Sequence, residues 1–267
     1  MHVITVCNHK GGTGKTTTSI YLGAALGLSG LRTLVIDMDP QGFLTQALGI
    51  PEPEPKASSL MLFQDQVPLT RVEPLKMKGF DLLPASMNMT KYMRKLDKSM
   101  DALWARQSLP TEDRYDVVLL DTAAAFTVYS LNALAAAHTI LVPVMPEYQP
   151  VVGAEQTYRS AHMVKARLNP DLQDTLFLLT RVDGRKKDHG RYSEYIRERF
   201  GADVLAAEIR TSSALSTKYE QGATAFDHSA SSRGAVDYAN AADECVRRLQ
   251  LTPSSARPEE QQEASAA

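Results

Sequence analysis

Short apolar runs, many of them rich in β-branched residues, recur along the chain between segments of helical periodicity. The runs predict buried strands over Val3–Cys7, Thr33–Asp37, Phe80–Leu83, Asp116–Asp121, Thr139–Val142, Thr175–Thr180 and Val204–Ile209. The intervening segments predict helices over Thr16–Leu28, 57–64, Met87–Leu109, Val128–Ala137, Val151–Leu168, 191–200 and Gly234–Gln250, with another after Ser212. Strands that alternate with helices, joined by right-handed crossovers, predict an α/β fold. By the handedness of such crossovers we expect a parallel sheet.

The predicted helix Met87–Leu109 carries a methionine-rich apolar stripe. The stripe consists of Met89, Met93, Leu96, Met100, Leu103 and Trp104. Such a stripe can form a groove for a partner, but helical spacing is more typical of a face that packs into the core.

A glycine-rich turn, Asn8–Thr17, joins the first predicted strand to the first predicted helix. Glycines let backbone N–H groups point inward, and the positive end of the helix adds to the attraction for phosphate. Lys15 can reach the β- and γ-phosphates, and the Thr16 hydroxyl can hold magnesium. His9 stands where the strict P-loop pattern has a glycine, and a second lysine, Lys10, precedes the paired glycines. The predicted ATP-binding residues are Lys10, Gly11, Gly12, Thr13, Gly14, Lys15, Thr16 and Thr17.

Acidic residues stand at the ends of two other predicted strands. Asp37 and Asp39 follow the second strand, in the stretch Asp-Met-Asp-Pro-Gln-Gly, and Asp121 ends the clearest buried strand. Carboxylates at the carboxyl ends of parallel strands face the crevice where α/β proteins bind ligands. Asp121 is placed like a Walker B carboxylate, which holds magnesium through water. We expect Thr16, Asp37 and Asp121 to form the magnesium site.

The motif KGGTGKTT, the Asp-Met-Asp-Pro-Gln-Gly stretch and Asp121 together resemble the ParA/MinD family of deviant Walker-A P-loop ATPases, over roughly residues 1–250. The resemblance implies an α/β fold with a doubly wound, mostly parallel sheet and helices on both faces. It further implies ATP and Mg²⁺ as cofactors and a face-to-face homodimer formed on ATP. It also implies that Lys10 crosses to the partner's phosphates and that Asp39 positions the attacking water. The catalytic residues it implies are Lys10, Lys15 and Asp39. Relatives usually carry a proline pair in the switch loop where this chain has Ala123 and Ala124.

Composition and the chain's end separate the branches of this family. The net charge is −2, and the two cysteines, Cys7 and Cys245, are not placed like the cluster cysteines of nitrogenase-iron-protein relatives. Residues 251–267 are acidic and broken by proline, which predicts a disordered tail after a single ATPase domain over 1–250 and disfavours a MinD-like membrane helix. With no signal peptide or membrane-spanning run in view, we expect a cytoplasmic protein with no membrane partner.

The ParA-like partition branch remains, in which relatives bind DNA non-specifically and segregate a chromosome or plasmid through a ParB-like adaptor. This predicts a protein that associates with the nucleoid through double-stranded DNA. Between Arg181 and Arg199 seven basic residues face four acidic ones, an excess of +3. A charge run is often only a solvated face. Arg185, however, falls where relatives carry a DNA-contacting arginine, whereas a second such position is Ala214. The predicted DNA-binding residues are Arg185, Lys186, Lys187 and Arg191.

Two other functions share this fold. One is MinD-like or other cargo positioning by the same type of ATPase. The other is an ATP-dependent ligase of the dethiobiotin-synthetase type, which activates a carboxylate and has a related phosphate loop. Lys10, the aspartate-rich stretch and the basic segment 181–199 favour partition over the ligase.

Overall fold

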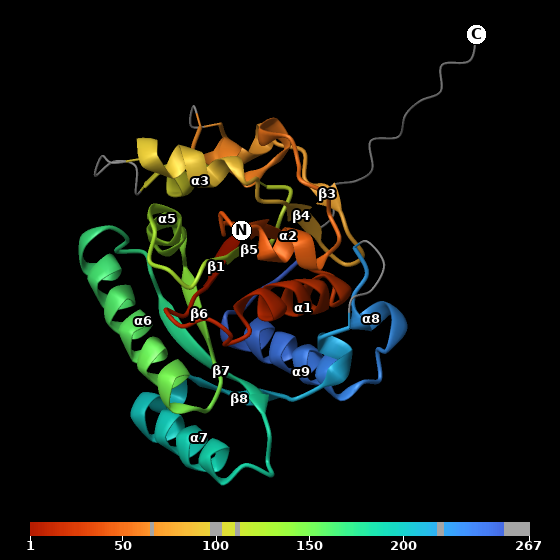
Figure 1. The fold of residues 1–267 in the computed structure, drawn as a ribbon, viewed down its shortest axis with the longest axis vertical. Coiled ribbons are helices and arrows are strands. Elements are labelled where there is room, and N and C mark those ends of the chain that lie inside the picture. Colours follow the sequence, from red (N-terminus) through yellow and green to blue (C-terminus); the bar gives the residue numbers. More distant parts are fainter. Residues whose placement is uncertain (65–66, 97–102, 110–112, 218–221, 254–267) are drawn as a thin grey trace.

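The computed structural model describes residues 1–64, 67–96, 103–109, 113–217 and 222–253. In these residues the strands form one eight-stranded sheet in the order β3-β4-β2-β5-β1-β6-β7-β8 (Figure 1). The strands are β1 (His2–Val6), β2 (Thr33–Asp37), β3 (Leu75–Lys76), β4 (Asp81–Leu83), β5 (Val117–Asp121), β6 (Thr139–Val144), β7 (Asp174–Val182) and β8 (Val204–Arg210). All neighbours pair in parallel except β3, which runs antiparallel to β4 at the edge. The predicted doubly wound, mostly parallel α/β fold is therefore confirmed.

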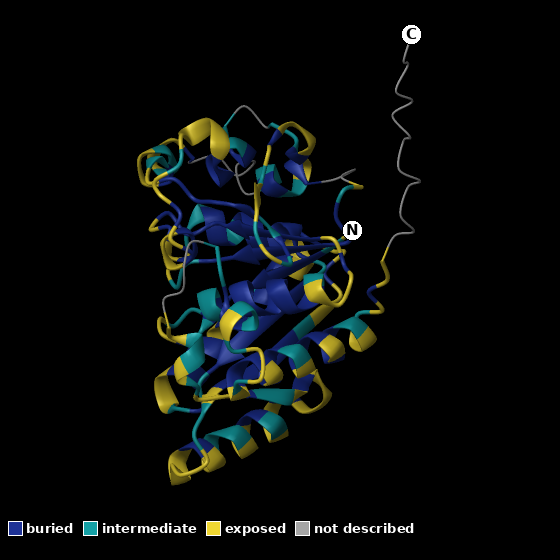
Figure 2. Ribbon diagram, turned by 90° about the vertical axis from the view of Figure 1, so that its right-hand side faces the viewer, coloured by how far each residue is buried: buried dark blue, intermediate teal, exposed yellow. Residues whose placement is uncertain are grey.

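Helices cover both faces of the sheet (Figure 1). They are α1 (Lys15–Leu28), α2 (Phe43–Ala47), α3 (Asn88–Tyr92), α4 (Trp104–Ser108), α5 (Val128–Ala136), α6 (Tyr148–Arg167), α7 (Lys187–Phe200), α8 (Ala225–His228) and α9 (Arg233–Arg248). The central strands are buried on both faces, which is why their sequences are almost continuously apolar (Figure 2).

Side chains of alternating direction along each strand divide the core between the two faces. On one face lies the α1/α9 core, which includes Ile4, Leu22, Leu176, Leu178 and Tyr238. On the other face lie the α3/α5 core, which includes Val3, Met89 and Tyr129, and the α6/α7 core, which includes Phe177, Leu179 and Phe200.

Helix α1 packs unusually close to the loop before β4. A Cβ atom added to Gly27 would lie 1.4 Å from the backbone oxygen of Gly79, so only glycine permits this approach. The contact fixes α1, and with it the phosphate loop at its first turn, against the sheet.

The prediction of one continuous helix over Met87–Leu109 is wrong. Helix α3 ends at Tyr92, a short turn covers Met93–Lys95, and the backbone of Leu96 leaves the helical region at ψ 82°. Residues 97–102, which include Met100, lie outside the described residues. Helix α4 then begins anew, because the side-chain oxygen of Asn132 in α5 accepts from the backbone N–H of Ala105. The contact satisfies an amide N–H in the first turn of α4. The stripe still packs inward as expected, since Met89 and Leu96 are buried in the α3/α5 core.

Several smaller differences have local causes. Helix α6 begins at Tyr148, three residues before the predicted start, because Pro150 is tolerated in a first helical turn. The helix predicted after Ser212 is a 3₁₀ turn over Ser213–Leu215. The helix predicted over 57–64 consists of the 3₁₀ turns Pro55–Ala57 and Ser59–Leu62. At the other end, Leu251 still packs into the α1/α9 core, and residues 254–267 of the predicted tail lie outside the described residues.

Candidate nucleotide-binding site

The glycine-rich turn forms an open cradle between β1 and α1. Gly12 and Gly14 have φ values of 77° and 89°, in the left-handed region that glycine adopts without strain. Gly14 is the N-cap of α1, and among the described residues no side chain caps that end of the helix. The first amide N–H groups of α1 are therefore left for an anion, and the helix dipole favours negative charge there.

Three contacts hold the cradle in shape. The Thr180 hydroxyl at the end of β7 donates to the backbone oxygen of Thr13 at 2.7 Å. The Asn8 amide donates to the backbone oxygen of Pro143 at 2.8 Å, and its oxygen accepts from the backbone N–H of Lys10 at 2.9 Å. Two of these contacts tie the loop to β6 and β7 of the sheet, and the third lies within the loop.

Lys15 is a buried cation within this cradle. Its Nζ donates to the backbone oxygen of Lys10 at 3.0 Å. Burial lowers the pKa of Lys15, while the nearby carboxyls of Asp121 and Asp39 oppose that shift. In the described part of the chain its hydrogen-bond partner is this carbonyl alone, and a phosphate would replace that weaker acceptor.

Asp121 and Asp37 end neighbouring strands at the same level, as the register of β2 and β5 pairs them directly. Thr16 and Ser19 donate their hydroxyls to Asp121, at 3.0 Å from Oδ2 and 2.7 Å from Oδ1. Burial raises the pKa of both carboxyls, and the proximity of Asp37 raises that of Asp121 further. A cation beside them favours ionisation of both.

These oxygen donors fit magnesium, which prefers hard ligands and keeps several waters. Asp121 and the hydroxyl of Thr16 are the better placed of the predicted ligands. Asp121 accepts from Thr16, which lines the cavity, whereas Asp37 accepts from Thr45 and from the N–H of Asp39, so the contacts of Asp37 organise the loop that leads into α2. No group of three histidine, cysteine or acidic side chains that could hold a metal occurs in the described part of the chain.

Asp39 and Lys10 differ in their relation to the cavity. Asp39 lines the cavity, and burial raises the pKa of its carboxyl although Oδ1 accepts from the N–H of Gln41. Lys10 is outside the cavity lining. Helix α6 packs against its backbone at Gly153, where an added Cβ would lie 2.7 Å from the Cβ of Lys10.

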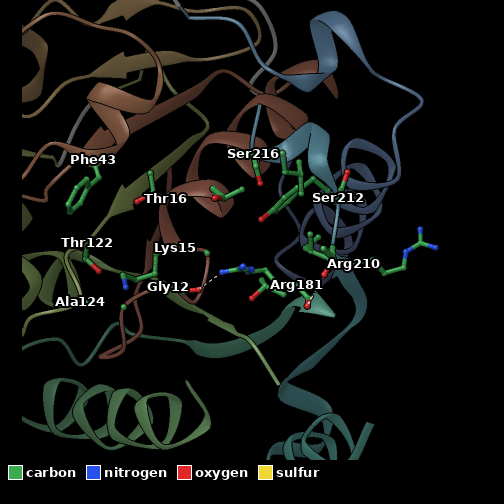
Figure 3. Close-up of a pocket in the computed structure, with 18 of the residues that line it drawn as sticks. Gly12, Lys15, Thr16, Phe43, Thr122, Ala124, Arg181, Arg210, Ser212 and Ser216 are labelled. Carbon is green, nitrogen blue, oxygen red and sulfur yellow. Dashed lines mark hydrogen bonds between the residues drawn. The ribbon is translucent and has the colours of Figure 1, made fainter. Parts of the chain in front are cut away.

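The cavity has a volume of about 470 Å³ and runs from the cradle to the ends of β7 and β8 (Figure 3). Six of the eight predicted ATP-binding residues line it: Gly11, Gly12, Gly14, Lys15, Thr16 and Thr17. At one end lie Phe43, Thr122 and Ala124, and at the other Arg210, Ser212 and Ser216 (Figure 3). Its volume lies within the range of small-molecule and cofactor sites.

A family model described as an AAA domain matches residues 1–174. The chromosome-partitioning ATPase Soj of Thermus thermophilus is 36% identical over 247 residues, which cover 92% of this chain and 96% of Soj. The chain belongs to the ParA/MinD family of P-loop ATPases.

Solved structures extend the likeness. A Mycobacterium smegmatis protein named cobyrinic acid a,c-diamide synthase, solved with an ATP analogue and magnesium, is 29% identical with a TM-score of 0.76 and matches 96% of this chain and 100% of that chain. An ATP complex of McdA from Cyanothece has a TM-score of 0.80 at 21% identity, over 96% of this chain and 99% of that chain, and shows the shared fold. Homologous structures are thus bound to ATP analogue or ATP, in agreement with the predicted cofactor class.

The phosphate loop of this ParA-like ATPase differs from the strict P-loop in the contacts made by the residues at the start of the loop. His9 replaces the glycine of the strict pattern, and its ring lies 3.1 Å from the hydroxyl of Ser160 in α6. Its ring centroid is 5.3 Å from that of Phe126, in the loop after β5 where relatives carry prolines. His9 therefore connects α6, the cradle and that loop.

The predicted DNA-binding residues lie together at the β7–α7 connection but most of them have carboxylate partners. Arg185 pairs with Asp183 at 2.8 Å, although its side chain is 88% exposed. Lys186 pairs with Glu147 at 3.2 Å, and Arg191 pairs with Asp188 at 3.3 Å. For Lys187 the described residues show no ion pair. The structure thus brings the four cations together and places acids among them.

Sequence reasoning missed three residues of the site. Ser19 stands one helical turn after Thr16, a spacing that could have linked it to the same carboxylate. Arg181 and Phe43 line the cavity without belonging to any motif. In the described residues no helix combines the length and the apolar character needed to cross a membrane.

Proposed function

We propose that this ParA-like ATPase forms a face-to-face homodimer around ATP and magnesium and hydrolyses the nucleotide in that dimer. The placement of its two lysines carries the proposal. Lys15 lies in the cradle, beside the cavity that Asp39 lines, whereas Lys10 lies next to the same loop but outside the cavity lining. Since Lys15 already fills the local cationic position, Lys10 acts on the nucleotide of a second subunit.

Each residue has a distinct part in this reaction. Lys15 and the amide groups at the start of α1 neutralise the phosphates, and Asp39 orients the attacking water. Thr16 and Asp121 would hold magnesium, which would supply further charge neutralisation to the phosphates. Phosphoryl transfer depends on such positioning and electrostatics more than on covalent chemistry. A lysine supplied by the partner makes turnover depend on dimerisation.

Exposed aromatic side chains near the cavity support the proposal that a second subunit covers it. Phe43 lines the cavity and is 58% exposed, and Phe126 beside His9 is 52% exposed. Large apolar side chains that gather at a functional cavity are typical of a surface that another protein covers.

We further propose that the ATP dimer binds duplex DNA without sequence specificity and positions a chromosome or plasmid through a ParB-like adaptor. Arg185, Lys186, Lys187 and Arg191 form the DNA-contacting surface. One copy of a partly neutralised patch binds weakly, and a dimer adds the phosphate contacts of two copies. Binding to DNA in this state places the protein on the nucleoid.

An ATP-dependent ligase is the second candidate, because one homologous structure bears the name of a diamide synthase. ATP turnover separates the two functions. The partition function predicts turnover that rises with duplex DNA and an adaptor peptide, whereas the ligase predicts turnover that rises with a small carboxylic acid and ignores DNA.

A further inference from the structure

Strand β7 loses its regular alternation at the edge of the nucleotide cavity. Along the strand, Leu176 and Leu178 belong to the α1/α9 core, whereas Phe177 and Leu179 belong to the α6/α7 core. Regular alternation would place Thr180 on the cavity face and the next residue on the far face.

The pairing with β8 shows where the pattern shifts. Leu179 pairs with Glu208 and Val182 pairs with Arg210, so three steps on β7 oppose two on β8. Val182 packs against the α6/α7 core, although regular alternation after Leu176 and Leu178 would turn it toward the α1/α9 core. This one-residue bulge leaves both Thr180 and Arg181 on the cavity side.

Arg181 has a backbone conformation that arginine rarely adopts. Its φ is 53°, in the left-handed region that favours glycine and asparagine. The Thr211 hydroxyl donates to the backbone oxygen of Arg181 at 3.2 Å, and the Thr211 N–H donates to that of Val182 at 3.0 Å. Bulges and strained residues concentrate beside active sites, where they redirect a side chain.

The redirected side chain brings an unneutralised cation into the cavity. Its Nη1 donates to the backbone oxygen of Gly12 at 3.4 Å, a long bond to an uncharged acceptor (Figure 3). Among the described residues Arg181 has no carboxylate partner. The other arginine of the lining, Arg210, differs, since Asp237 accepts from its Nε and Nη2.

We infer that Arg181 is a nucleotide-binding residue whose guanidinium contacts the phosphate chain at its sugar end, at the α-phosphate. In Figure 3 Arg181 lies between the cradle, at Gly12 and Lys15, and the far end of the cavity, at Arg210 and Ser212. The opposite side of the cradle carries Thr122 and Ala124. The contact therefore falls on a part of the nucleotide that ATP and ADP share. The inference rests on nucleotide binding alone and is independent of dimerisation and DNA.

Three variants test this contact. Arg181→Asn removes the charge but keeps a residue that tolerates positive φ. Arg181→Lys keeps a charge without the planar fork. Arg167→Asn is the matched control, because Arg167 is exposed at the end of α6 remote from the cavity edge. Calorimetric titration with ADP and with a non-hydrolysable ATP analogue, each with magnesium, gives the affinities, and thermal melting without nucleotide gives the stabilities.

Arg181→Asn should lower the affinity for both nucleotides by the same factor. We expect about 10- to 100-fold for the removal of a charge-assisted hydrogen bond, with an unchanged melting temperature. Arg181→Lys should be intermediate and Arg167→Asn unchanged. Equal affinities of wild type and Arg181→Asn, a loss confined to the ATP analogue, or a melting temperature that falls with the affinity would overturn the inference. Failure of the wild-type chain to bind either nucleotide would instead contradict the proposed function.

Discussion

The Nζ of Lys15 donates to the backbone oxygen of Lys10, 3.0 Å away. The bond joins the two lysines of the glycine loop through the backbone of one and the side chain of the other. It closes the loop around the position of a phosphate, and it leaves the side chain of Lys10 free of that task. The division of roles that we propose for the two lysines, one within the subunit and one toward a partner, starts from this arrangement.

Asp39→Ala should stop turnover while nucleotide binding and dimerisation persist. A residue that orients water acts mainly in the transition state, so kcat falls, by about 100-fold or more, with little change in nucleotide affinity. Steady-state hydrolysis and nucleotide titration measure the two effects separately. If Asp39→Ala loses magnesium or ATP affinity instead, Asp39 acts in the ground state and the assignment fails.

Duplex DNA should bind only in the presence of ATP and should dissociate progressively between ~50 and ~200 mM salt. Changing Lys186 and Lys187 together to Ala should weaken binding and lower the salt slope by about one for each phosphate that the protein no longer neutralises. Arg185→Ala should have a smaller effect, because Asp183 already neutralises Arg185. Fluorescence anisotropy with unrelated duplexes measures this, with Arg167→Ala as the control. Equal binding with and without ATP would exclude this surface from the mechanism.

Stability should fall as the pH drops from about 6.5 toward 4, and His2 should contribute to the fall. Burial, with His138 nearby, lowers the pKa of His2 from its ordinary value of 6.5 to about 4. In this window the unfolded chain binds the proton and the folded chain does not, so acid favours unfolding. His2→Gln should remove part of the slope, on the order of 1 kcal/mol after allowance for partial solvent screening. Urea unfolding at pH 4.5 and 7.5 measures it, with exposed His162→Gln as control; identical slopes for His2→Gln and wild type would refute the role.

The features that the sequence predicted best are those that depend on residues close together along the chain. The run ending at Asp121 is apolar because β5 is buried on both faces, and the glycines of the cradle have the positive φ that their positions require. These local patterns were enough for the sheet and for the phosphate loop.

Features that depend on distant residues were not predictable. The contact in the first turn of α4 comes from Asn132 of another helix, which accepts from the N–H of Ala105. The neutralisation of Lys186 depends on Glu147, 39 residues away. Arg181 was missed because the bulge that turns it toward the cavity is set by the pairing of β7 with β8, which periodicity along one strand does not reveal.

The oligomeric state with ATP tests the central claim, that Lys10 acts across a nucleotide-dependent dimer. Light scattering during size-exclusion chromatography should show that ATP and magnesium convert the wild-type monomer to a dimer. Lys10→Ala should retain nucleotide affinity but lose the dimer or its turnover, whereas Lys15→Ala should lose phosphate binding itself. A Lys10→Ala protein that dimerises on ATP and hydrolyses it at the wild-type rate would contradict the account.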